Sequence, residues 1–156
     1  MKKLIYAAAF TVILASNAPA TIAGGAMQNA NIPHLVHSGA HPNSARIQGA
    51  THHFEVHVQG RALSEIAIAL PDDLRIRGGI EVKNQSHQKI ETQLSVNNKK
   101  ATVVFAQPVA PDTTISIDMR GIHTPGYSHN WGYAISGKMV GLNAEIPLGR
   151  VGVQTY

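Results

Sequence analysis

The sequence predicts an all-β protein, an antiparallel β-sandwich, and three observations support this prediction. Apolar and polar residues alternate over short runs, which is the pattern of strands that bury one face. About seven such runs follow residue 50 at intervals of roughly ten residues, with turn-forming residues between them. Helical periodicity is nearly absent after the first 20 residues. Short strands at this spacing are typical of an immunoglobulin-like sandwich or of a barrel, and we favour the sandwich.

Residues 1–20 have the features of a secretory signal peptide. Two lysines precede an apolar run over residues 4–15, and small residues around Pro19 form a cleavage site. The alternative is a membrane anchor, but a spanning helix needs about 20 apolar residues, and this run is shorter. We therefore expect the leader to be removed near Thr21. No transmembrane segment is expected in the mature chain.

Residues 21–49 are expected to form an irregular amino-terminal arm. Glycine, proline and asparagine recur through this stretch and leave no room for a long helix. The apolar residues Ile32, Leu35, Val36 and Ile47 predict that part of the arm packs on the body. The β-sandwich domain is then expected over residues 50–156.

The first strand is predicted over residues 51–58. Its apolar side chains share the face opposite His53, Glu55 and His57, as in a half-buried strand. Residues 61–69 also fit a helical face, but the following Pro71 and the isoleucines favour a strand. The remaining strands are predicted over residues 66–70, 90–96, 102–105, 114–119, 133–140 and 149–153.

Two of these strands carry a more specific expectation. Residues 102–105 are almost wholly apolar, which predicts a strand covered on both faces. A short connection containing Pro108 and Pro111 joins them to residues 114–119. We therefore expect these two strands to form an antiparallel pair.

Composition narrows the class of function. Charged residues make up only 14% of the chain, against about a quarter in typical proteins. The formal charge of +4 becomes +2 when the two leader lysines are removed, and no basic cluster with interleaved aromatics occurs, so we expect no nucleic-acid partner. The chain has no cysteine, which excludes disulfides, thiolate metal sites and an acylated amino-terminal cysteine.

The sharpest local constellation is His53, Glu55 and His57. Residues two apart on a strand point the same way, about 6.5–7 Å apart. Two imidazoles and a carboxylate on one face can converge on Cu²⁺ or Zn²⁺, and the other interpretation is a solvated polar face. Further histidines in the arm could fold onto the same ion: His34, His37 and His41. His52 points to the opposite face and would not join.

A second cluster lies on a loop rich in glycine and proline. It comprises His123, Tyr127, His129 and Trp131. Exposed aromatic loops on a rigid scaffold commonly contact ligands. The alternative, which we favour for Trp131, is that the single tryptophan fills the core.

Catalytic motifs are weak throughout. Ser128 and His129 could form a hydrolase triad with Asp112 or Asp118, but neighbouring residues in an extended loop point apart. Residues 132–138 imitate a phosphate-binding loop, yet Met139 stands where serine or threonine would ligate Mg²⁺. We therefore expect no enzymatic activity.

The chain resembles a cyanobacterial exported family, the domain of unknown function 2808. The similarity spans roughly residues 33–155 and rests on four segments. They are residues 50–56, the hairpin-like residues 101–117, the glycine-aromatic stretch from Gly126 to Ala134, and residues 148–151. The chain departs from the family pattern at His52, His53, His57 and in residues 123–131. The resemblance implies an exported, envelope-associated β-rich domain and assigns no reaction and no functional residue.

These observations together predict an exported, non-enzymatic binding or structural module in the periplasm or cell envelope. Its expected partner is an envelope protein or a glycan, and this interpretation requires no cofactor. The alternative is a protein that binds copper or zinc through His53, Glu55 and His57.

Overall fold

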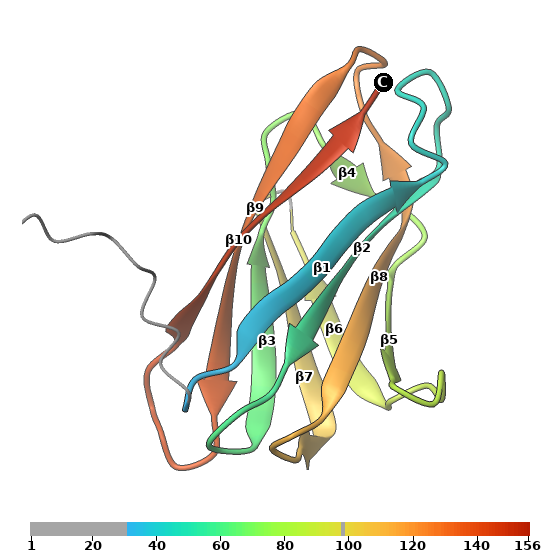
Figure 1. Ribbon diagram of the computed structural model, residues 1–156. Helices are drawn as coiled ribbons and strands as arrows, with labels where there is room; N and C mark the ends of the chain where they lie inside the picture. Colours follow the sequence, from blue (N-terminus) through green and yellow to red (C-terminus); the bar gives the residue numbers. More distant parts are fainter. Residues whose placement is uncertain (1–30, 98) are drawn as a thin grey trace, which may run out of the picture.

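The computed structural model describes residues 31–97 and 99–156, which fold into two antiparallel β-sheets packed face to face (Figure 1). The prediction of an all-β sandwich is therefore confirmed. The strands of the described residues are, in chain order, β1 (His34–His41), β2 (Ala50–His57), β3 (Leu63–Ala69), β4 (Arg75–Ile76), β5 (Ile80–Asn84), β6 (Thr92–Val96), β7 (Lys100–Val109), β8 (Thr114–His123), β9 (His129–Met139) and β10 (Ile146–Thr155).

We call the two sheets A and B. Sheet A has the strand order β1-β2-β8-β4, and β5 pairs with β8 along the same edge as β4. Sheet B has the order β10-β9-β3-β7-β6. Within residues 31–97 and 99–156, no helix is long and apolar enough to cross a membrane.

The core lies between the sheets, where the strands direct their apolar side chains. Phe54 and Val56 of β2 and Ile115 and Ile117 of β8 are fully buried from sheet A. Sheet B contributes the equally buried Ile66 and Ile68 of β3, together with residues of β7, β9 and β10. The choice of a strand over a helix for this part of the chain is thus confirmed.

The prediction of an irregular arm over residues 21–49 is wrong for residues 34–41. These residues form β1, which pairs antiparallel with β2 at the edge of sheet A. A β-bulge between Leu35 and His37 breaks the alternation, which is why the strand has no period-two signature. Residues 21–30, like the predicted leader over residues 1–20, lie outside the described residues.

The expected pairing of residues 102–105 with residues 114–119 is also wrong. β7 pairs with β3 and β6 in sheet B, whereas β8 pairs with β2, β4 and β5 in sheet A. The connection between them crosses from one sheet to the other and is held by Val58, whose backbone bonds Asp112 and Thr113 at 2.8 and 2.9 Å. β7 is covered on one face only, since Val104 is 39% exposed.

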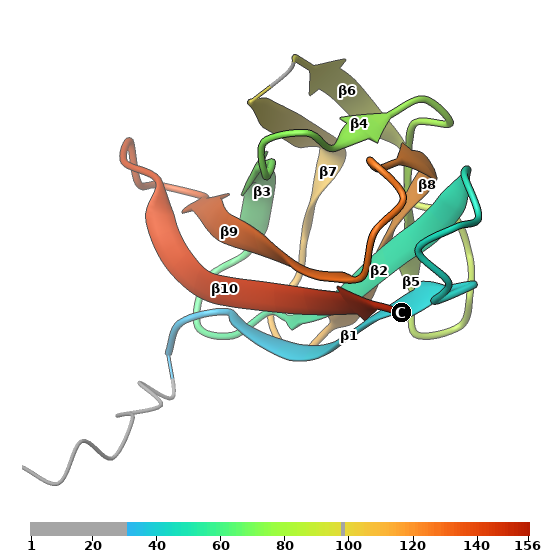
Figure 2. The ribbon, with the colours of Figure 1, turned by 90° about the horizontal axis from the view of Figure 1, so that it is seen from above.

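One side of the sandwich is closed by edge strands from different sheets. β1 of sheet A runs beside β10 of sheet B, as the view from above shows (Figure 2). The Ser38 hydroxyl donates a hydrogen bond across this seam to the carbonyl of Gly152 at 3.2 Å. β1 is therefore held by β2 on one side and by β10 on the other.

Candidate functional site

The outer face of sheet A collects the histidines of β1 and β2. β2 alternates regularly between buried and half-buried residues, so His53, Glu55 and His57 share the outer face. This part of the sequence prediction is confirmed. The histidine face, as we call it, consists of His34, His37, His53, Glu55 and His57.

The bulge in β1 is what brings the arm histidines onto this face. His34 lies opposite His57, and His37 lies opposite Glu55, although residues three apart on a regular strand point to opposite faces. Val36 is the extra residue, without a partner in the ladder and 56% exposed. The bulge shifts the alternation by one residue, and His34 and His37 therefore point the same way.

The imidazole rings on this face form two cross-strand pairs. The ring centres of His34 and His57 are 5.4 Å apart, and those of His37 and His53 are 5.6 Å apart. The second pair is diagonal, because the residue directly opposite His53 is Gly39. A β-carbon on Gly39 would lie 2.9 Å from the Cε1 atom of His53, so the ring of His53 occupies the space of the missing side chain.

The ring of His57 is also oriented from its other side. Its Nδ1 atom is 2.9 Å from the hydroxyl oxygen of Thr114 on β8. When Nδ1 carries the proton and donates this bond, Nε2 keeps a free lone pair. The orientation of this imidazole is thus set by a neighbouring strand.

A polar groove of about 440 Å³ adjoins the histidine face and shares Glu55 with it. Its lining residues come from β2, β5, the β5–β6 turn and β8: Glu55, Lys83, Asn84, Gln85, His87, Thr114, Ser116 and Asp118. Lys83 pairs with Asp118 at 3.2 Å, and both side chains are largely covered. The groove therefore combines amides, hydroxyls and charges of both signs on a rigid sheet.

The predicted trio of His53, Glu55 and His57 does not close around one point. Each imidazole approaches a histidine of β1 rather than the other imidazole of β2. Among residues 31–97 and 99–156, no three histidine, aspartate or glutamate side chains are grouped so as to hold a metal ion. Binding of copper or zinc by this trio stays a prediction.

His52 points into the core, as predicted, and there it meets Tyr133 of β9. Its Nδ1 atom is 2.6 Å from the Tyr133 hydroxyl, and the two rings meet edge to face. Burial, and secondarily the proximity of His53, lowers the pKa of His52 from 6.5 to about 4. Burial also raises the pKa of Tyr133 above its ordinary value. The pair is therefore a neutral hydrogen-bonded link between the sheets.

Trp131 fills the core, as favoured from the sequence. It is 1% exposed, and its indole N–H donates to the Thr155 hydroxyl at 3.0 Å. Tyr127 and His129 pack against it, the first tilted and the second edge-on, with ring centres 6.1 and 4.7 Å from that of Trp131. Tyr127 is half exposed, so a ligand could reach its ring.

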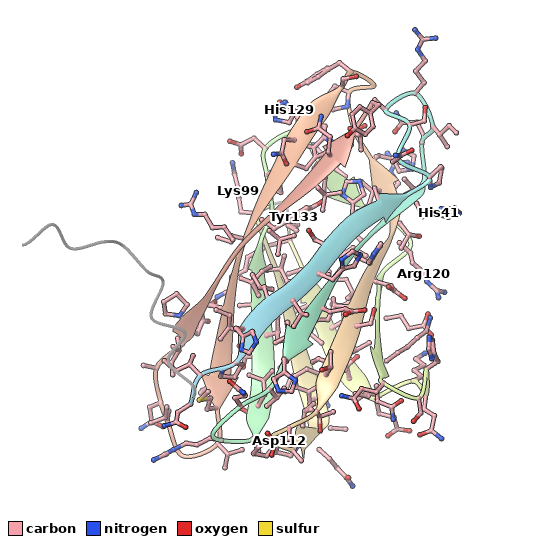
Figure 3. All side chains as sticks on the ribbon, viewed as in Figure 1. His41, Lys99, Asp112, Arg120, His129 and Tyr133 are labelled. Atoms are coloured by element: carbon pink, nitrogen blue, oxygen red, sulfur yellow. The ribbon has the colours of Figure 1, made fainter. Side chains whose placement is uncertain are left out.

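The residues of the candidate hydrolase triad are far from assembled. Asp112 lies at the opposite end of the sandwich from His129 (Figure 3). Asp118 lies on sheet A and pairs with Lys83, whereas His129 begins β9 in sheet B and packs on Trp131. The structure thus gives Ser128 and His129 no carboxylate partner from either candidate.

From the sequence, the arm histidines could fold toward those of β2, but neither their cross-strand pairing nor the polar groove was predicted. Both depend on strands that the period-two pattern does not reveal, namely β1 and β5. The excess of histidine in residues 34–57 was the only sequence signal for the first feature.

Comparison with known proteins assigns this sequence to a family. The profile of a protein family of unknown function, DUF2808, matches residues 26–141. The chain belongs to this family. The DUF2808 match begins before β1, in agreement with a domain that starts earlier than residue 50. No curated protein matches the sequence.

Two solved structures share the fold of this DUF2808 protein. The N-terminal domain of a Streptococcus gordonii adhesin has a TM-score of 0.55 and 12% identity, covering 80% of this chain and 32% of that one. The major pilin subunit of Bacillus cereus has a TM-score of 0.51 and 11% identity, covering 79% and 40%. The chain thus spans less than half the length of either. At these identities the likeness shows the fold alone.

Proposed function

We propose that this DUF2808 protein is an exported, non-enzymatic binding module of the periplasm or cell envelope, and that it contacts a protein partner through the polar groove. The observation that carries the proposal is the groove itself. Side chains from separate strands of sheet A converge there around about 440 Å³ of accessible space. Binding residues are commonly held in this way by a rigid scaffold.

The chemistry of the groove favours a protein over a glycan. Its lining presents the ammonium of Lys83 paired with the carboxylate of Asp118, together with the carboxylate of Glu55 and with amides and hydroxyls. Charges of both signs complement a polypeptide that carries charges of both signs. A sugar ring is commonly bound by stacking on tryptophan or tyrosine, and neither lines the groove.

Two further observations support export and a binding role. The first 20 residues have the composition of a cleavable signal peptide. The two solved structures with this fold belong to an adhesin and to a pilin subunit, so a binding or structural role is in keeping with the fold. Neither comparison carries a ligand over to this chain.

Site-specific photo-crosslinking tests the contact surface. A photoreactive amino acid replaces Ser116, which lines the groove, and in a matched control replaces Ser95, which lies exposed on β6 of sheet B. In cells that produce the protein naturally, we expect a discrete protein adduct from position 116 and none from position 95. The adduct should weaken when Lys83→Glu reverses a charge in the groove. Equal labelling at both positions, or none at either, would refute the proposal.

The same experiment distinguishes the alternative partner. An adduct whose added mass is removed by glycan hydrolases, leaving the mass of this chain alone, identifies a glycan and overturns the choice of a protein. Export is tested separately by fractionation and amino-terminal sequencing, which should find a mature chain beginning near Thr21 outside the cytoplasm. An intact chain confined to the cytoplasm would contradict export.

A further inference from the structure

The histidine face offers a chemistry that the polar groove does not. The imidazoles of His34 and His57 lie directly opposite one another on β1 and β2, and those of His37 and His53 approach one another diagonally across the same two strands. Neutral imidazole is a preferred protein ligand for Cu²⁺ and Zn²⁺. Two such pairs on adjacent strands constitute two candidate chelates.

The distances fit chelation. Two imidazoles bound to one ion, each with a metal–nitrogen bond of about 2.0–2.1 Å, have ring centres about 5 Å apart. The observed separations of 5.4 and 5.6 Å are therefore within a small side-chain rotation of that geometry. The exposed position of His37 and the half-buried position of His34 leave room for this rotation.

Local structure supports each pair independently. For the first pair, Thr114 bonds Nδ1 of His57 at 2.9 Å. A partner on the second ring nitrogen is the usual means of orienting a histidine ligand. For the second pair, the absence of a side chain at Gly39 lets the ring of His53 lean toward His37. Glu55 lies directly opposite His37, between His53 and His57 on β2, but within the described part of the chain it is not grouped with either pair as a third ligand.

We propose that the two cross-strand pairs, His34–His57 and His37–His53, each chelate one Cu²⁺ or Zn²⁺ ion and so clip the edge strand β1 to β2. The inference goes beyond the proposed function, because it concerns the histidine face and not the polar groove. It differs from the single site expected from the sequence, which gathered His53, Glu55, His57 and the arm histidines on one ion, because two ions each join one histidine of β1 to one histidine of β2. Water completes each coordination shell, since no third protein ligand is grouped with either pair among residues 31–97 and 99–156.

Binding should follow the order of stability of divalent complexes and should stabilise the fold. Cu²⁺ binds nitrogen ligands more tightly than Zn²⁺ does, and we expect that order here. An ion that binds only the paired strands favours the folded chain by mass action. The melting temperature should therefore rise with metal concentration.

The test is a calorimetric titration of the exported, purified chain with CuCl₂ and with ZnCl₂ at pH 7.5. The variant His34→Gln/His37→Gln removes the β1 half of both pairs and leaves β2 intact. His129→Gln, which changes an exposed histidine of sheet B, is the matched control. We expect a Kd for Cu²⁺ below about 10 μM, weakened at least about tenfold in the double variant and unchanged in the control.

A parallel thermal melt keeps the result interpretable. Without metal and with EDTA, the double variant should melt as one transition, which shows that it folds. Added Cu²⁺ should raise the melting temperature of the natural chain and of His129→Gln but not of the double variant. A Kd weaker than about 10 μM, or an equal Kd in the double variant, overturns the inference.

Failure of this inference is distinguishable from failure of the proposed function. The crosslink from position 116 is repeated in EDTA, where no metal is bound. If the adduct persists while the titration fails, only the metal sites are refuted. If the titration succeeds and no adduct forms, the histidine face binds metal and the proposed protein contact is wrong.

Discussion

The buried imidazole of His52 should make the stability of this protein depend on pH in a defined window. The pKa of His52 is lowered to about 4 in the folded chain, mainly by burial, and returns toward 6.5 when the chain unfolds. Between these values the unfolded chain binds a proton at residue 52 that the folded chain does not. Stability is therefore full above pH 6.5 and falls as the pH drops toward about 4.

The magnitude follows from the size of the shift. Each unit of pKa difference corresponds to about 1.4 kcal/mol of unfolding free energy. A decrease from 6.5 to about 4 therefore removes about 3 kcal/mol from the free energy of unfolding across the window. That loss is a large part of the stability of a typical small domain.

The perturbation that isolates this effect is His52→Asn. The amide has no proton equilibrium in this range and can still bond the Tyr133 hydroxyl. Urea unfolding, followed by the fluorescence of the single, buried Trp131, is measured at intervals from pH 7.5 to 4 at constant ionic strength and with EDTA. The advantage of the natural chain over His52→Asn should shrink by about 3 kcal/mol as the pH falls.

A control separates the causes of the shift. His53→Gln removes the secondary electrostatic contribution but leaves the burial of His52 unchanged, so most of the pH dependence should remain. If the difference between the natural chain and His52→Asn is the same at pH 7.5 and pH 4, the buried neutral histidine is not the source. The reasoning would then be refuted.

Two further predictions concern the core and a turn. Thr155→Val should lower the unfolding free energy by about 1–3 kcal/mol in urea titrations, because the buried indole N–H of Trp131 loses its acceptor, while Thr155→Ser should retain most of it. Gly60→Ala should destabilise more than Gly49→Ala in thermal melts. Both have positive φ, costing about 1–2 kcal/mol, but only at Gly60 would the β-carbon lie against backbone, 3.0 Å from the carbonyl carbon of Asn31. Equal unfolding free energies for the two Thr155 variants would contradict the first argument, and equal melting temperatures for the two glycine variants would contradict the second.

The regular strands of this fold could be predicted from their residues. β2 alternates strictly over its whole length and β8 does so over residues 114–119, because each lies within a sheet with one face on the core. β1 could not be predicted in this way, because its bulge removes the periodicity and Gly39 and the neighbouring prolines imitate a loop. β4 and β5 were not predicted because each is too short to show a clear alternation. Both pair with the same edge of β8, on either side of Gly78 and Gly79.

The candidate site, like the fold, could be predicted from the sequence only in part. The sequence by itself determined that His53, Glu55 and His57 share one face, since the alternation of a single strand is a local property. It also determined that His52 faces the other way. Only the tertiary structure decided that His34 and His37 join that face, that His52 meets Tyr133 from sheet B, and that β7 and β8 lie in different sheets. These outcomes depend on strand order and register, which are set by contacts between residues far apart in the chain.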